Sequence, residues 1–278
     1  MPFTRKRFGQ HFLEPVWADK VVAAIAPSPE DVFLEIGPGA GVLTLRLAPR
    51  VKHLTAIEID RDLIAQLQPR LPANVTLING DFLQQELQIV DGRLQIGSHQ
   101  SAISNLQSPI RVAGNLPYNV SSPILFKLLE LQTEHPITDA TLMLQKEVAD
   151  RIVAAPGSAD YGVLSVLVQW KAAVTHLLTL PPGAFRPPPK VRSALIRLAF
   201  RRAEVTLADP AGFQQLVRSV FTQRRKTLSN ALGPFAEGTG LAPAAALRQA
   251  GIDPTRRPQT LQLVEIARLA DVFHTAKK

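Results

Sequence analysis

Apolar and polar positions alternate in short blocks through the first two-thirds of the chain. Mainly apolar runs predict buried strands at residues 32–36, 53–59, 75–79, 110–114 and 140–144. Stretches with helical periodicity lie between them and predict helices at residues 42–48, 62–71 and 122–131. Because parallel strands need a long crossover connection, this alternation predicts a parallel sheet with helices on both faces.

The pattern changes towards the C-terminal end. Helices are predicted at 146–154 and 164–174, followed by strands at 177–180 and 194–200. From residue 209 it is purely helical, with helices expected at 213–221, 225–232, 243–250 and 261–273. We therefore predict an α/β domain over residues 1–204 and a small all-α domain over residues 205–278. The polar segment 82–109 predicts one short helix and an exposed loop.

Composition excludes several classes of protein. No apolar run approaches the roughly 18 residues of a membrane span, so a membrane partner is not expected. The chain has no cysteine, which excludes disulfides, thiolate metal sites and base methylation through a cysteine nucleophile. We expect a cytoplasmic monomer without a metal.

Charge is distributed unevenly along the chain. Residues 1–180 contain 15 Lys and Arg against 17 Asp and Glu, whereas residues 181–278 contain 16 against 6. A basic region beside a nearly neutral one favours a polyanionic partner, and nucleic acid fits best. The alternative is a solvated basic surface without a partner.

The tetrapeptide Asn115-Leu116-Pro117-Tyr118 directly follows the apolar run 110–114. The amide oxygen of Asn115 can accept a hydrogen bond from an exocyclic amino group. The carbonyl of Leu116 can accept the second N–H, because Pro117 restricts the backbone there. Tyr118 offers a flat face for stacking a base. Two acceptors on one amine free its lone pair for an electrophilic methyl, so the motif predicts N-methylation; the alternative is an ordinary strand-to-loop turn.

A glycine-rich turn and two carboxylates follow the first three predicted strands. Gly37, Gly39 and Gly41 lie between a strand and a helix, where glycines allow a ligand to approach the backbone closely. Glu58 ends the next strand and can bind both ribose hydroxyls, and Asp81 follows the third strand, where it can accept from an adenine amino group. This arrangement fits S-adenosyl-L-methionine better than NAD.

Each of these carboxylates has a simpler interpretation. Glu58 can be an exposed charge at a strand end, and Asp81 can form an Asx-turn. Glu35, inside the first strand, can hydrogen-bond the amino-acid end of a ligand or brace the glycine turn. The glycine turn alone is weak evidence for a cofactor site, and the presence of Glu58 and Asp81 at the following strand ends strengthens it.

Six motifs in order make the chain similar to a known family. They resemble the KsgA/Dim1 family of small-subunit ribosomal RNA adenine dimethyltransferases, over about residues 5 to 260. The motifs are Arg5-Lys6-Arg7-Phe8-Gly9-Gln10-His11-Phe12-Leu13, Glu35-Ile36-Gly37-Pro38-Gly39, Asn115-Leu116-Pro117-Tyr118-Asn119, Leu144-Gln145-Lys146-Glu147, Phe185-Arg186-Pro187-Pro188-Pro189-Lys190-Val191 and Phe221-Thr222-Gln223-Arg224-Arg225-Lys226-Thr227.

The resemblance implies a Rossmann-like S-adenosylmethionine-dependent methyltransferase domain and a C-terminal helical domain that binds RNA or the ribosome. It implies two methyl transfers to N6 of each of two adjacent adenosines, in a hairpin loop near the 3′ end of small-subunit rRNA, with a role in ribosome biogenesis. The ligand-contacting positions that it implies are His11, Leu13, Gly37, Glu58, Asp81 and Asn115. Position 11 is usually Asn in the family, so His11 predicts altered cofactor affinity; the alternative is a packing residue.

Three further features are candidates for contact with RNA. Phe185 can close over a base opposite Tyr118, although it can equally be a core residue in a rigid connector. Lys190 ends the proline-rich loop that begins at Phe185. A basic cluster at the start of a predicted helix suggests a phosphate partner, because cations there oppose the helix dipole; its members are Arg224, Arg225 and Lys226. The alternative for this cluster is a solvated helix face.

Other functions remain as alternatives. An Erm-like methyltransferase of large-subunit rRNA would use the same cofactor and motif. A non-catalytic ribosome-assembly factor could retain the scaffold without turnover. An NAD oxidoreductase is the most distant, because no acid–base pair for hydride transfer is visible.

Overall fold

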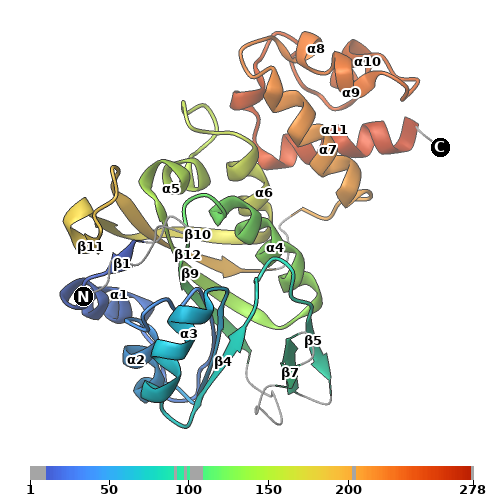
Figure 1. The fold of residues 1–278 in the computed structure, drawn as a ribbon. Coiled ribbons are helices and arrows are strands. Elements are labelled where there is room, and N and C mark those ends of the chain that lie inside the picture. The colour runs from blue at the N-terminus through green and yellow to red at the C-terminus, as the bar shows by residue number, and fades with distance from the viewer. Residues whose placement is uncertain (1–10, 91–92, 97–98, 101–108, 202–204, 277–278) are drawn as a thin grey trace. The chain divides into compact units, whose positions relative to one another are not determined.

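The computed structural model describes residues 11–90, 93–96, 99–100, 109–201 and 205–276 (Figure 1). The chain divides into two compact units. One consists of Met1–Ala149 with Thr175–Phe200, and the other of Asp150–Val174 with Arg201–Lys278.

The first unit contains most of a seven-stranded sheet with the strand order β10-β12-β9-β8-β2-β3-β4. The strands are β2 (Val32–Ile36), β3 (His53–Glu58), β4 (Val75–Asn79), β8 (Ile110–Asn115), β9 (Ile137–Gln145), β10 (Ala172–Leu180) and β12 (Ser193–Phe200). Neighbours among β9, β8, β2, β3 and β4 are parallel, and β12 is antiparallel to β9. The predicted parallel sheet is therefore confirmed for five strands.

The order in which the chain fills the sheet creates a crevice at its centre. From β2 the chain passes through α2 (Thr44–Leu47) to β3, and through α3 (Arg61–Leu67) to β4. It then crosses to the other side of β2, where α4 (Ser121–Glu134) connects β8 to β9. Right-handed crossovers in opposite directions place α2 and α3 on one face and α4 on the other. The carboxyl ends of β2 and β8 flank this reversal, where open α/β sheets bind ligands.

The helix α1 (Pro15–Ile25) was not predicted, although its sequence carries a signal. Pro15 occupies the first turn, where its missing N–H costs nothing, and an apolar stripe follows at helical spacing. The stripe is buried against the sheet; it consists of Ala18, Val21, Val22 and Ile25. Two arginines of the sheet bind the last carbonyls: Arg111 Nη2 donates to the carbonyl of Ile25, and Arg197 Nη2 to those of Ala24 and Ile25.

A stability prediction follows from the end of α1. Ala26 has φ 49° and ψ 63°, and its N–H donates to the carbonyls of Val22 and Ala23. Because this left-handed conformation favours glycine, we expect Ala26→Gly to raise the free energy of unfolding by about 1 kcal/mol and the melting temperature by about 2 °C. Differential scanning calorimetry measures this change. Ala26→Val is the control, and a stabilising effect of valine would contradict the explanation.

Two predicted segments differ from the structure. Part of the segment predicted as helix and loop forms a separate antiparallel sheet of β5 (Leu87–Val90), β6 (Arg93–Ile96) and β7 (His99–Gln100), so that prediction is wrong for these described residues. The predicted helix 164–174 is α6 (Val163–Lys171), and β10 starts at Ala172, before the expected strand. In short apolar runs, helical and strand periodicity are hard to separate.

Among the residues of the second unit that the structure describes, the regular elements are helices apart from the first residues of β10. Beyond α6 it contains the last residues of α5 (Lys146–Val153), then α7 (Pro210–Thr222), α8 (Leu228–Ala231), α9 (Gly233–Ala236), α10 (Pro243–Gln249) and α11 (Leu263–Ala276). The ring of Phe213 lies 5.2 Å from that of Trp170, and Phe273 packs edge-on against Phe235 at 5.2 Å. Trp170, Phe213 and Phe273 are buried, so these aromatic pairs contribute to the packing of this unit.

Candidate active site

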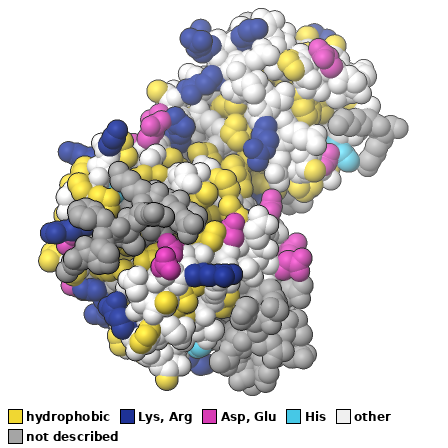
Figure 2. Space-filling model, viewed as in Figure 1, with side chains coloured by type: hydrophobic (Ala, Val, Ile, Leu, Met, Phe, Trp, Pro, Cys, Tyr) yellow, Lys and Arg dark blue, Asp and Glu magenta, His cyan; other side chains and the backbone are white. Residues whose placement is uncertain are grey.

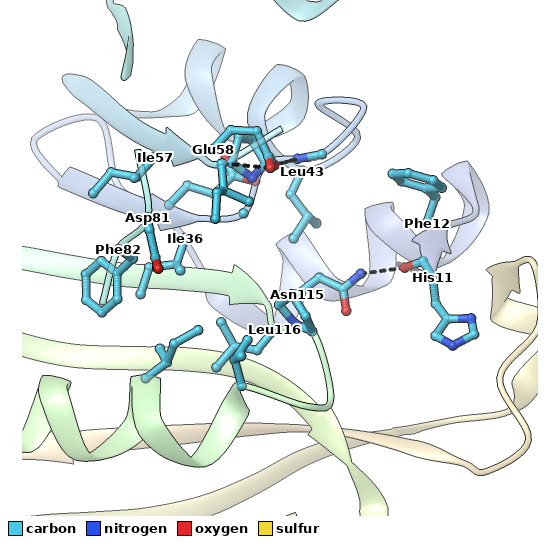
Figure 3. A pocket seen from close by; sticks show the side chains of 18 of the residues that line it. His11, Phe12, Ile36, Leu43, Ile57, Glu58, Asp81, Phe82, Asn115 and Leu116 are labelled. Carbon is cyan, nitrogen blue, oxygen red and sulfur yellow. Dashed lines mark hydrogen bonds between the residues drawn. The ribbon is translucent and has the colours of Figure 1, made fainter. Parts of the chain in front are cut away.

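A pocket lies at the carboxyl ends of β2, β3, β4 and β8 (Figure 3). Ile36, Glu58 and Asn115 are the last residues of β2, β3 and β8, and Asp81 follows β4 by two residues. Parallel strands end at the same edge of a sheet, which brings these distant positions together. Of the glycine turn, Gly37 and Gly39 line this pocket, whereas Gly41 packs against Leu67 and does not. The other residues predicted for the cofactor and for the base-binding motif line it as well: His11, Leu13, Glu58, Asp81, Asn115, Leu116, Pro117 and Tyr118.

The glycine turn between β2 and α2 lines the pocket through Gly37 and Gly39. Gly37 and Gly39 have φ values of +69° and +58°, a conformation that favours glycine. A Cβ atom at Gly39 would lie 3.2 Å from the ring of Phe12, which also lines the pocket. The chain is therefore compact here, and a ligand can approach the backbone of the turn closely.

Glu58 is fixed by backbone donors around both carboxylate oxygens. Gly39 N–H donates to Oε2 at 2.9 Å, and the N–H groups of Ile59 and Asp60 donate to Oε1 at 2.9 and 3.0 Å. The side chain is only 4% exposed, so the alternative of an exposed strand-end charge is wrong. Burial raises the pKa of Glu58, and the three backbone donors oppose that rise. A carboxylate has about four acceptor positions, so Glu58 retains capacity for a hydroxyl donor.

Asp81 forms an Asx-turn and also lines the pocket. Its Oδ1 accepts the N–H of Leu83 at 2.9 Å, which is the Asx-turn contact. The same side chain lines the pocket beside Phe82, where Figure 3 shows both residues. The local turn thus orients the carboxylate and does not exclude a ligand contact.

Glu35 is the most deeply buried acid of the pocket. It is 1% exposed, and its Oε2 has no hydrogen-bond partner in the part of the chain that the structure describes. Burial raises the pKa of Glu35 to about 7; the Thr44 hydroxyl opposes the rise and the Glu58 carboxylate adds to it. Buried polar atoms are nearly always hydrogen-bonded, so this oxygen is suited to a ligand donor.

Asn115 is oriented by the N-terminal segment. Its Nδ2 donates to the carbonyl of His11 at 2.9 Å, and Figure 3 shows this bond with the amide oxygen turned away from it. The next residues form a fixed turn, because Leu116 N–H donates to the carbonyl of Met143 and Val120 N–H to that of Pro117. The amide oxygen is therefore held as an acceptor at a rigid position.

Tyr118 is anchored at both its ring and its hydroxyl. The hydroxyl lies 2.6 Å from Ser193 Oγ, and burial raises the pKa of the phenol while the Ser193 contact lowers it. The ring centroid lies 5.4 Å from that of His11, with the planes 31° apart. His11 Nδ1 in turn lies 2.6 Å from the carbonyl oxygen of Pro187. His11 thus both packs and lines the pocket.

Other candidates lie elsewhere. Phe185 is not among the pocket residues; it is 2% exposed within the core beneath α1, which agrees with its alternative interpretation. Lys190 is exposed and follows the short strand β11 (Phe185–Arg186) by four residues. Arg224 Nη2 donates to the carbonyl of Ala159, and Arg225 and Lys226 are exposed. This basic cluster follows α7 and precedes α8, so the prediction that it starts a helix is wrong, and the dipole argument built on it does not hold.

The sequence did not indicate several residues that line the pocket or hold a residue of its wall. Ser193 anchors Tyr118 from a position 75 residues away, and no local pattern indicates it. Phe12, Ile59 and Phe82 each stand beside a predicted residue, so proximity in sequence was the available signal; all three line the pocket.

Two kinds of feature are absent from residues 11–90, 93–96, 99–100, 109–201 and 205–276. No group of three or more His, Asp and Glu side chains there is placed to hold a metal ion. No helix there is long and apolar enough to cross a membrane. The acceptors of the pocket are carboxylate, amide and backbone oxygens.

The sheet order and the pocket at its reversal define a Rossmann-like methyltransferase fold with an attached helical region. Residues 3–272 match the family model described as ribosomal RNA adenine dimethylase, and the chain belongs to this family.

Individual relatives agree with this family. The chain is 42% identical to ribosomal RNA small subunit methyltransferase A of Chromobacterium violaceum, covering 97% of this chain and 95% of the relative. It is 43% identical to the protein of the same name from Acinetobacter baylyi, covering 96% and 91%. Among solved structures, a dimethyladenosine transferase from Plasmodium falciparum gives a TM-score of 0.78 at 25% identity, covering 96% and 98%. The 23S rRNA methyltransferase ErmE gives 0.64 at 25% identity, covering 95% and 99%.

Proposed function

We propose that this protein transfers methyl groups from S-adenosyl-L-methionine to N6 of two adjacent adenosines in a hairpin loop near the 3′ end of small-subunit rRNA. The product is N6,N6-dimethyladenosine, and the reaction serves ribosome biogenesis. The observation that carries the proposal is that the glycine turn, Glu58, Asp81 and the Asn115–Tyr118 motif line one pocket. The relatives that carry the name ribosomal RNA small subunit methyltransferase A support the choice of substrate.

The donors and acceptors of the pocket fit S-adenosyl-L-methionine. Gly37 and Gly39 would admit the amino-acid part, and the unpartnered Oε2 of Glu35 suits its ammonium group. Glu58 would accept from a ribose hydroxyl at its remaining acceptor position, and Asp81 would accept from the adenine amino group. His11 and Leu13 would close the pocket from the N-terminal side.

The protein would bind the target base through the Asn115 turn. The amide oxygen of Asn115 and the carbonyl of Leu116 would accept the two N–H groups of the adenine amine, and the ring of Tyr118 would stack on the base. The Tyr118 hydroxyl is held by Ser193, so the stacking face is fixed before the base arrives. Positions fixed in advance reduce the entropy lost on reaching the reactive geometry.

The reaction needs no strong base in the protein. S-adenosyl-L-methionine supplies an activated methyl group on a sulfonium. Asn115 and Leu116 would orient the nitrogen lone pair, and the apolar walls would exclude water from the reacting groups. The amine loses its proton after it has become cationic. Monomethyladenosine keeps one N–H for these acceptors, so the same turn can orient the second transfer.

The helical unit is proposed to bind rRNA. On the face shown in Figure 2, many Lys and Arg side chains are spread over this unit, with fewer Asp and Glu. Arg225 and Lys226 are exposed in the turn after α7 and are suited to phosphate contacts; Arg224, which also holds Ala159, would support them. Lys190 would add a contact from the first unit. We retain residues 1–204 as the proposed methyltransferase domain and 205–278 as the proposed RNA-binding domain, and propose a cytoplasmic monomer.

Removing two exposed cations tests the RNA-binding role. We expect the double variant Arg225→Ala/Lys226→Ala to bind small-subunit rRNA about 10-fold more weakly, and the slope of log affinity against log salt to fall by about 1 to 2. Filter binding across a salt series measures both quantities. The double variant Arg225→Lys/Lys226→Arg keeps the charge and should bind normally; unchanged binding in the alanine variant would exclude these contacts.

The activity itself is tested by incubating the protein with labelled S-adenosyl-L-methionine and purified ribosomal subunits that lack the modification. Mass spectrometry of the digested RNA should show dimethyladenosine at two adjacent positions of the small-subunit RNA. Label confined to the large subunit would indicate an Erm-like enzyme. Cofactor binding without transfer to either subunit or to assembly intermediates would favour a non-catalytic assembly factor.

A further inference from the structure

A single lysine on α4 holds the loop that carries Asp81. The ammonium group of Lys127 donates to three backbone carbonyls, those of Phe82 at 2.7 Å, Leu83 at 3.0 Å and Gln85 at 2.6 Å. A lysine ammonium has three donors and no acceptor, so these bonds use its full capacity. Lys127 is therefore committed to this loop and does not line the pocket itself.

The loop needs such a cation because of its own hydrogen bonding. The carbonyl of Asp81 accepts the N–H groups of Gln84 at 2.9 Å and Gln85 at 3.1 Å, which closes one helical turn. In a single turn the following carbonyls have no helical partner, and a cation at this end is favoured by the local dipole. Lys127 satisfies these carbonyls from a neighbouring helix.

Packing and charge tie the lysine to the same loop. The Lys127 ammonium lies 5.2 Å from the centre of the Phe82 ring, and Phe82 is 4% exposed. Partial burial lowers the pKa of Lys127, while the carboxylates of Asp81, Glu130 and Glu86 oppose that change. One helical turn earlier, Ile124 of α4 lines the pocket directly. The helix thus forms a wall of the pocket and also anchors the loop beside it.

We propose that Lys127 is a positioning residue for the nucleoside end of the ligand site, and that it acts by fixing Asp81 and Phe82. This inference rests on the proposed function, because it assumes that the pocket binds S-adenosyl-L-methionine. The Asn115 turn is held by other contacts, to His11 and Met143, and does not depend on Lys127. Loss of Lys127 should therefore affect cofactor affinity much more than the methyl-transfer step.

The test compares Lys127→Met with a matched control, Arg197→Met. Arg197 is a half-buried cation of β12 that also donates to backbone carbonyls at a helix end, but it does not line the pocket. Calorimetric titration with S-adenosyl-L-methionine, thermal melting and turnover at saturating cofactor are measured for both. Hydrogen exchange of the peptide covering residues 81–86 is followed without ligand. Lys127→Arg is included because a guanidinium can keep part of the bonding.

We expect Lys127→Met to raise the cofactor Kd about 10- to 100-fold, to change turnover at saturation by less than about 3-fold, and to speed exchange in residues 81–86. Lys127→Arg should recover part of the affinity. Arg197→Met should lower the melting temperature without changing Kd. Equal Kd values for Lys127→Met and the unaltered protein would overturn the proposal, as would an equal rise in Kd for Arg197→Met.

Failure of the proposed function gives a different result. If the unaltered protein does not bind S-adenosyl-L-methionine, the function is wrong, and hydrogen exchange alone then decides the role of Lys127. Faster exchange confined to residues 81–86 in Lys127→Met would support positioning of the loop. Unchanged exchange there would overturn it.

Discussion

Replacement of Asn115 by alanine is expected to lower turnover on small-subunit rRNA about 1000-fold while the protein remains folded. The variant loses the oxygen that would accept from the adenine amine and the bond from Nδ2 to the carbonyl of His11. Removing one oriented polar group from a reacting centre typically costs 100- to 1000-fold, and misplacement of the turn adds to this. Single-turnover methylation of unmodified small subunits measures the loss.

Asn74→Ala is a suitable control for the Asn115 variant. Asn74 Nδ2 also donates to backbone carbonyls, those of Ala48 and Val51, but the residue does not line the pocket. This control should lose some thermal stability and keep normal turnover. Normal turnover in Asn115→Ala would contradict the proposed role of the motif. Equal losses of turnover in both variants would show that the lower turnover of Asn115→Ala results from reduced stability.

Replacement of Glu35 by glutamine is expected to stabilise the ligand-free protein at alkaline pH. Burial raises the pKa of Glu35 from 4.5 to about 7, so the folded state binds more protons than the unfolded state between these values. The stability that this carboxyl allows is complete below about pH 4.5 and is lost as the pH rises through 7. The loss corresponds to about 3 kcal/mol, and glutamine, which does not ionise, avoids it.

The measurement is the difference in melting temperature between Glu35→Gln and the unaltered protein from pH 4 to pH 8. We expect this difference to grow by about 6 °C over the range, whereas the exposed control Glu30→Gln should show no such trend. The substitution should stabilise the ligand-free protein but weaken cofactor binding. We expect affinity for S-adenosyl-L-methionine to fall about 10-fold in Glu35→Gln, because an ionised Glu35 would pair with the ligand ammonium. A constant difference across the pH range would show that Glu35 ionises normally.

The residues at the strand ends could be located from sequence because sheet geometry is regular. Once β2, β3 and β8 are recognised as parallel, the residues that end them must meet at one edge. Gly37, Glu58 and Asn115 were placed correctly on that basis. Their assigned ligand roles remain predictions until the variants are measured.

Other features could not be predicted, because they depend on contacts between distant segments. β1 (Phe12–Leu13) pairs with β11 (Phe185–Arg186), which carries His11 to the pocket and buries Phe185 in the core. His11 and Pro187 are 176 residues apart in the chain. Phe12 lines the pocket, whereas Phe185 is buried in the core. No local periodicity encodes this difference, since both residues are apolar and lie in short extended segments.

The amino-acid sequence by itself determined the alternation of strands and helices, the glycine turn, the acidic residues at strand ends and the basic C-terminal region. These features follow from local periodicity, backbone preference and composition. The tertiary structure decided which groups hold them in place: Ser193 against Tyr118, His11 against Asn115, and Lys127 against the loop of Asp81. Such contacts join segments that are distant in sequence, and their partners are set by the packing of the whole sheet and its helices.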